Sequence, residues 1–123
     1  MGLDQVAYAT KEGEDRIDIQ RWRKHPNLQG FMEQLWGDKG QPLPEGVELD
    51  NSPMGDFNCI PLSLTLGDID ELEDCVKNCK LPTTGGFFFG TSRASDKGLD
   101  EDFIREARKL LIDGWEVYYD SWW

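Results

Sequence analysis

The sequence predicts an α+β domain: a single small sheet of about five strands, with about three helices packed mainly on one of its faces. Two observations lead to this fold class. Segments near both ends alternate apolar and polar residues with the period of a strand, whereas three segments between them repeat apolar residues with the period of a helix. Because 123 residues suffice for one hydrophobic core, we expect residues 1–123 to form a single domain.

Two N-terminal strands are predicted at residues 5–10 and 16–22. The polar segment between them contains a glycine and is typical of a turn, so the two strands should form a β-hairpin. Alternation in the second strand predicts that Ile17, Ile19 and Arg21 share one side of it.

Three helices are predicted at residues 26–36, 65–79 and 99–112. The first opens with a proline, whose missing N–H would have no partner at a helix start. The second begins with Thr65 and Asp68 in the pattern of a capping box, with Asp in place of the usual Glu. The third has the clearest apolar stripe, with acids in its first turn and bases towards its end.

The remaining strands are predicted at residues 57–62, 85–90 and 115–120. The last of them follows the third helix after a single break at Gly114, so it should fold straight back alongside that helix. Residues 41–56 are rich in Pro, Gly and acid, and we expect a mobile loop there. The residues of the last strand expected to face the same way are Trp115, Val117 and Tyr119.

The chain is strongly acidic, with 24 acidic and 13 basic residues and a net charge of −11. That balance disfavours direct binding to nucleic acid, whose backbone needs many Lys and Arg. It fits a partner protein with a basic surface. Acidic surfaces also keep small proteins soluble, so the charge alone leaves both interpretations open.

The sequence contains no run of about 18 apolar residues, and its N-terminus lacks the basic and apolar regions of a signal peptide. We therefore expect a soluble intracellular protein without membrane contact. The odd number of cysteines predicts reduced thiols. A zinc site built from Cys59, Cys75, Cys79 and His25 is the less favoured alternative, because the sequence contains no C-x₂-C pair, the tight ligand spacing that usually marks structural zinc.

The chain has one basic cluster, residues 21–25 (RWRKH), which contains its only histidine. At a predicted strand end beside a predicted helix N-terminus, this cluster could hold a phosphate or carboxylate, with aromatic rings stacked against the ligand. The alternative is that its cations pair with surface acids. No motif predicts a catalytic residue, a metal site or a cofactor. The candidate ligand-binding residues are Arg21, Trp22, Arg23, Lys24, His25, Tyr119, Trp122 and Trp123.

Several segments together resemble a family of small proteins of tailed bacteriophages and related bacterial sequences. The resemblance spans nearly the whole chain and is carried by residues 1–5 (MGLDQ), 22–25 (WRKH), 28–30 (LQG), 57–59 (FNC), 85–90 (GGFFFG) and 117–123 (VYYDSWW). Members are sometimes labelled phosphoglycerate kinase-like. That label does not suit this chain, which lacks the length and the nucleotide-binding motifs of that two-domain enzyme.

The resemblance implies a phage origin and action in the host cytoplasm. Small phage accessory proteins often act by stoichiometric binding, so the first hypothesis is an acidic, aromatic-rich accessory protein that binds a host protein, as an inhibitor or in an anti-defence role. The second is binding of a nucleotide or other phosphorylated ligand through residues 21–25 and the aromatic residues. The third is a small enzyme that uses His25 as a general base, for which the sequence identifies no partner.

Overall fold

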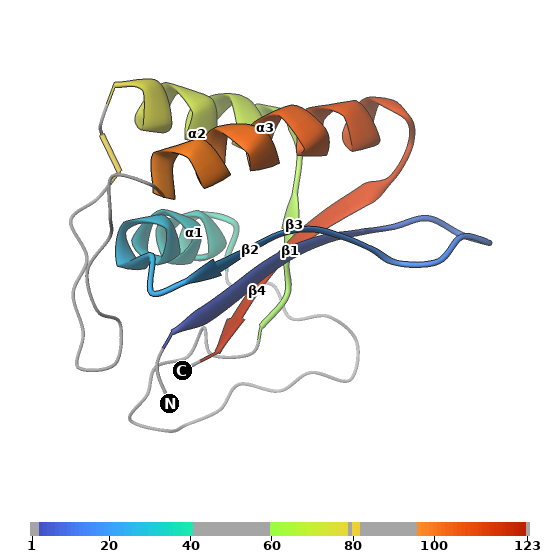
Figure 1. Ribbon diagram of the computed structural model, residues 1–123, viewed down its shortest axis with the longest axis horizontal. Coiled ribbons are helices and arrows are strands. Elements are labelled where there is room, and N and C mark those ends of the chain that lie inside the picture. The colour runs from blue at the N-terminus through green and yellow to red at the C-terminus, as the bar shows by residue number, and fades with distance from the viewer. Residues whose placement is uncertain (1–2, 41–59, 79, 82–95, 123) are drawn as a thin grey trace.

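The computed structural model describes residues 3–40, 60–78, 80–81 and 96–122 (Figure 1). The predicted loop at 41–56 and the predicted strand at 85–90 lie outside these residues. The described elements are β1 (Asp4–Thr10), β2 (Ile17–Arg23), α1 (Pro26–Asp38), β3 (Leu62–Leu64), α2 (Leu66–Lys77), α3 (Asp96–Ile112) and β4 (Glu116–Trp122).

The described strands form one sheet in the order β2-β1-β4-β3, and every neighbouring pair is antiparallel. The helices gather on one face of this sheet; α3 contacts β2, β1 and β4, and α2 lies beside α3 (Figure 1). The predicted α+β class is confirmed. Among the described helices, none combines the length and the apolar content needed to cross a bilayer.

The core face of the sheet is organised around Tyr119, which is 0% exposed. On β1 the small side chain of Ala7 lies opposite Tyr119, and on β3 Leu62 does so from the other side. Val117 faces the same core, and Trp115, just before the strand, packs against its edge. The predicted orientation of the aromatic C-terminal strand is therefore confirmed.

The predicted alternation in the second strand is wrong for Arg21. Ala7 lies opposite Gln20 and Tyr8 opposite Asp18, so Ile19 is an extra residue that forms a β-bulge. Ile19 itself packs against the core. Because a one-residue shift moves every later side chain to the other face, Arg21 points away from the core and its neighbour Trp22 points into it.

The ends of two helices follow the predicted signals. The hydroxyl of Thr65 accepts a hydrogen bond from the backbone N–H of Asp68, whose carboxylate accepts one in return from the N–H of Thr65, so the capping box is confirmed. At the end of α3, Gly114 has a φ of 90°. The next N–H, that of Trp115, donates to the carbonyl of Leu110 at 2.9 Å, and this closure turns the chain directly into β4.

Gly114→Ala is expected to lower the free energy of unfolding by about 1 kcal/mol, because a Cβ is strained at a positive φ. No other atom lies within 4 Å of that Cβ, so the loss is purely conformational. Gly37→Ala is the matched control: the same change inside α1, also without near neighbours, is expected to stabilise slightly. Urea denaturation distinguishes the two, and equal effects at both positions would contradict the account.

Candidate functional site

The structure separates the predicted ligand-binding residues into two groups. Arg21, Arg23 and Lys24 are exposed at and just beyond the end of β2. His25 and Tyr119 are buried, at 3% and 0% exposure respectively. Trp22 is buried, Trp122 is partly exposed at the end of β4, and Trp123 lies outside the described residues.

Part of the predicted set does meet at one surface hollow. Asp4 pairs with Arg23 on one side and with Trp122 on the other, which brings the ends of β2 and β4 together across β1. The hollow has a volume of about 270 Å³, slightly below the usual range for small-molecule sites. The lining residues are Asp4, Gln5, Arg21, Trp22, Arg23 and Trp122.

His25 lies instead between two buried carboxylates of α3. Its Nε2 is 2.8 Å from Asp100 Oδ2, and its Nδ1 is 3.7 Å from Asp96 Oδ2. The other oxygen of Asp100 accepts a hydrogen bond from the indole N–H of Trp22 at 2.9 Å. Burial raises the pKa of Asp100, and the hydrogen bond with His25 partly opposes that rise.

A second buried set of hydrogen bonds continues from His25 to the sheet. The side-chain amide of Gln5 accepts from the backbone N–H of His25 at 2.9 Å and donates to the carbonyl of His25 at 3.0 Å. The same amide donates to the hydroxyl of Tyr119, which in turn donates to Gln29. Burial raises the pKa of Tyr119 far above its ordinary value, so its hydroxyl remains a donor.

This buried polar network joins β1, β2, β4, α1 and α3 in one place. His25, Asp96 and Asp100 are each 3% exposed or less, so a substrate would reach the imidazole only if packed residues moved. Buried hydrogen-bonded networks of this kind hold elements in a unique arrangement, although the side-chain nitrogen of Gln29 adds nothing to that effect, since it has no hydrogen-bond partner among the described residues. The geometry therefore favours a structural role for His25 over a role as general base.

The sequence prediction missed Asp96 and Asp100 as partners of His25. The signal was present in their spacing: four residues apart, they fall on the same helical face as the buried Phe103, Ile104 and Ala107. The sequence pattern predicts a helix start at residue 99 and treats Asp100 only as one of the acids of the first turn, whereas the helix begins at Asp96. An acid at a core-facing position needs a buried partner.

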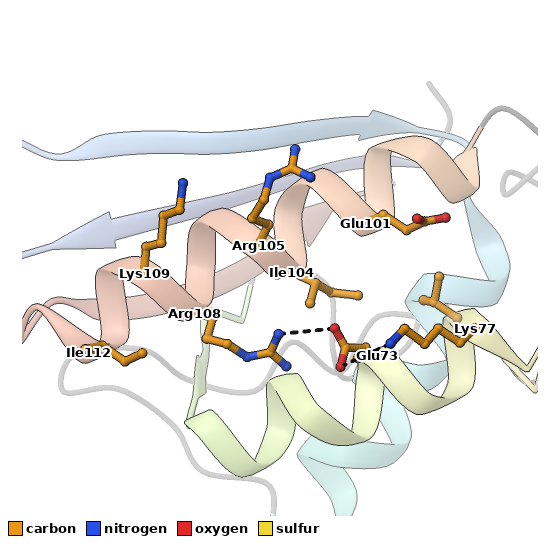
Figure 2. Close-up of a pocket in the computed structure, with 9 residues that line it drawn as sticks. Glu73, Lys77, Glu101, Ile104, Arg105, Arg108, Lys109 and Ile112 are labelled. Atoms are coloured by element: carbon orange, nitrogen blue, oxygen red, sulfur yellow. Dashed lines mark hydrogen bonds and ion pairs between the residues drawn. The ribbon is translucent and has the colours of Figure 1, made fainter.

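A groove of about 450 Å³ runs between α2 and α3 (Figure 2). Its floor contains Val76 and Ile104, both nearly inaccessible. Arg108 reaches from α3 to α2, where it pairs with Asp70 at 2.8 Å and with Glu73 at 3.1 Å. The lining residues, none of them in the predicted set, are Glu73, Val76, Lys77, Glu101, Ile104, Arg105, Arg108, Lys109 and Ile112.

The β1–β2 hairpin extends past the rest of the described chain (Figure 1). Every residue from 11 to 18 is exposed. Arg16 lies over the ring of Tyr8 at 3.8 Å and pairs with Asp18 at 2.9 Å. The tip of the hairpin holds three acids that have no ion-pair partner among the described residues: Glu12, Glu14 and Asp15.

On the face of the sheet opposite the helices, Tyr118 stacks on Tyr8 with ring centroids 5.3 Å apart. The hydrogen bond that its hydroxyl donates to Glu116 raises the pKa of Tyr118 to about 12, with burial adding to the effect. Since this folded-state pKa exceeds the ordinary 10.0, the hydrogen bond stabilises the fold below pH 10.0 and its contribution is lost as the pH rises through about 12.

Glu116→Gln is expected to move the ionisation of one tyrosine back towards pH 10.0, because the carboxylate acceptor is then gone. Ultraviolet absorbance during an alkaline titration measures this shift. Glu106→Gln is the control, because Glu106 is exposed and pairs with Lys109 rather than with a tyrosine, and it should leave the titration unchanged. An identical titration of Glu116→Gln and the unsubstituted protein would contradict the assignment.

Of the predicted cysteines, only Cys75 falls among the described residues; it is a half-buried free thiol whose pKa is raised by burial. Within the described part of the chain, no group of three or more His, Cys, Asp and Glu side chains is placed to hold a metal ion. Comparisons with protein-family models, with curated proteins and with solved structures each give no match.

Proposed function

We propose that this protein acts by stoichiometric binding to a host protein with a basic surface, as a phage accessory protein of the inhibitor or anti-defence type. The observation that carries the proposal is the projecting hairpin, whose exposed tip holds Glu12, Glu14 and Asp15 without ion-pair partners among the described residues. A protruding element of this kind can enter a concave surface that the rest of the molecule cannot reach.

The overall charge supports the same proposal. A net charge of −11 produces a field that attracts a basic surface and speeds the encounter with it. The unpaired acids at the tip would then make the closest contacts. Aromatic residues behind the tip, Tyr8 and Tyr118, give that face of the sheet a rigid, partly apolar surface.

The position of His25 supports binding over catalysis. A general base has to lie within hydrogen-bond reach of the proton it removes. The imidazole of His25 lies between Asp96 and Asp100, and the His25 side chain is 4% exposed. Both ring nitrogen atoms of His25 therefore face carboxylates of the protein itself and not a substrate.

Capture from a host lysate tests the proposal. The tagged protein should retain one host protein in a molar ratio near one to one, and the complex should weaken as the salt concentration is raised from about 0.05 to about 0.5 M, since salt screens exposed charges. Recovery of no stoichiometric partner from several hosts would contradict it. So would a complex that salt does not weaken.

A second function, binding of a phosphorylated small ligand, is favoured by one observation: Arg21, Arg23 and Trp122 line the same hollow. Two guanidinium groups beside an indole ring suit a phosphate attached to an aromatic base. Asp4 lines the same hollow, and its negative charge opposes an anion. The hairpin proposal does not have this conflict, and we place it first.

If the hollow binds such a ligand, a nucleotide at millimolar concentration should raise the melting temperature, and Arg23→Ala should abolish that rise. Lys24→Ala is the matched control, because Lys24 is an exposed neighbouring cation that does not line the hollow. Differential scanning fluorimetry measures both variants. An unchanged melting temperature of the unsubstituted protein with each common nucleotide would eliminate this second function.

A further inference from the structure

The groove between α2 and α3 has a composition that the acidic hairpin does not explain. Four of its nine lining residues are cationic and two are acidic, in a chain whose net charge is −11. The three groove cations that belong to α3 differ in where they point. Arg108 meets Glu73 between the helices, whereas Arg105 and Lys109 stand along the rim of α3 that faces away from α2 (Figure 2).

The apolar part of the groove reaches the surface. Val76 and Ile104 form a buried floor at 4% and 3% exposure, and Ile112 at one end is 71% exposed. An isoleucine exposed to that degree gains free energy when a partner covers it. The groove therefore has an apolar strip among charged residues in which cations outnumber the acids Glu73 and Glu101 by two to one.

The exposure of the charged side chains that form the walls of the groove indicates what kind of molecule would fit it. The side chains of Lys77, Arg105 and Lys109 are 68%, 60% and 67% exposed. Small-molecule sites usually enclose most of their ligand, and walls this exposed cannot do so. A helix laid along the groove needs no enclosure, because it buries only one of its own faces.

We propose that the groove between α2 and α3 binds an acidic amphipathic helix of a partner protein. Leucine-like side chains of that helix would cover Val76, Ile104 and Ile112, and its acids would pair with Arg105 and Lys109 along the rim. This surface is distinct from the hairpin, so the protein could hold a basic partner by one surface and an acidic helix by another.

The present partners of the rim cations do not oppose this binding. Arg105 pairs with Asp102 at 2.6 Å and Lys109 with Glu106 at 3.6 Å, both within α3 and both exposed. Exposed ion pairs of this type contribute little to stability. Arg105 and Lys109 can therefore exchange these acids for acids of a partner, while the Arg108 pair keeps α2 and α3 together.

A synthetic helical peptide of about 14 residues, about 21 Å long, provides the probe. It carries leucines at helical spacing with glutamates on both sides of the leucine stripe. A peptide of the same composition in scrambled order and one with Lys in place of Glu are the controls. Fluorescence anisotropy measures binding to the full chain, and methyl shifts of Ile104 and Ile112 in NMR spectra locate the site.

The acidic peptide is expected to bind at least tenfold more tightly than either control peptide, and the variant Arg105→Glu/Lys109→Glu should lose at least tenfold of that affinity. Lys24→Glu/Lys97→Glu makes the same change in charge at exposed positions outside the groove, and should stay within about twofold of the unsubstituted protein. Ile112→Asp, a single exposed change, should weaken binding as well.

Absence of binding would overturn the proposal, and so would equal binding of the Lys peptide or of the scrambled peptide. Unchanged affinity of Arg105→Glu/Lys109→Glu would also overturn it. Circular dichroism confirms that each variant is folded before its affinity is compared. Neutral substitutions at the hairpin tip should leave peptide binding intact, which separates this test from the one for the hairpin.

Discussion

Replacing Asp100 by alanine is expected to lower the free energy of unfolding by about 3–5 kcal/mol, the usual loss when one partner of a buried charged pair is removed. Asp100 is 1% exposed, and its carboxylate bonds to Trp22 at 2.9 Å and to His25 at 2.8 Å. In the alanine variant the buried indole N–H of Trp22 loses its acceptor and the buried imidazole of His25 loses its partner. A water molecule could replace the carboxylate only by entering the core.

Two variants control for this effect. Asp100→Asn keeps an oxygen that can accept from Trp22, so it should be clearly less destabilising than the alanine variant. Asp102→Ala removes an acid of the same helix that is exposed and pairs only with Arg105 in the described contacts, and should change stability by about 0.5 kcal/mol or less. If urea denaturation gave equal losses for Asp100→Ala and Asp102→Ala, the buried network would not stabilise the fold.

Gln5→Leu is expected to be the next most destabilising change. It should lower the free energy of unfolding by about 2–4 kcal/mol, although leucine has a similar volume and suits a buried strand. The amide of Gln5 is 2% exposed and bonds to the N–H and the carbonyl of His25 and to the hydroxyl of Tyr119. Leucine leaves these three groups without that partner inside the protein.

Gln20→Leu is the matched control, because Gln20 lies on the neighbouring strand and is only half-buried. Its side chain donates one long hydrogen bond of 3.3 Å to the carbonyl of Leu99 and accepts one exposed hydrogen bond of 3.1 Å from the backbone N–H of Arg21. The free energy of unfolding of Gln20→Leu should fall by less than about 1 kcal/mol. Hydrogen exchange gives a local readout: the amide of His25 should exchange faster in Gln5→Leu than in the unsubstituted protein. Unchanged protection of that amide, together with unchanged stability, would contradict the role assigned to Gln5.

The elements that the sequence predicted correctly are those specified by neighbouring residues. Thr65 and Asp68 are three residues apart and form their capping box within one turn, and Gly114 adopts its positive φ where the helix must stop. The β-bulge at Ile19 could not be predicted in this way, because it depends on how β2 aligns with β1. That alignment decides which face Arg21 occupies.

The candidate site was less predictable for the same reason. The basic cluster is contiguous in sequence and easily noticed, but Asp100, which holds His25, is 75 residues away along the chain. The α2–α3 groove likewise depends on side chains such as Lys77 and Arg105, which become neighbours only when the two helices pack. Asp100 and Arg105 each have a local explanation in the sequence, as a leading acid and a trailing base of one helix, and that explanation gives no sign of their tertiary contacts.

Capture of a host protein by hairpin variants tests the proposed function most directly. In Glu12→Gln/Glu14→Gln/Asp15→Asn the three unpaired acids of the tip become neutral without a change in size, and the amount of captured protein is expected to fall at least tenfold at physiological salt. Glu71→Gln/Asp74→Asn/Glu106→Gln removes the same charge from exposed helix positions and should retain nearly all of the captured protein. Equal capture by both triple variants would show that the hairpin does not bind the partner, and would contradict the proposal.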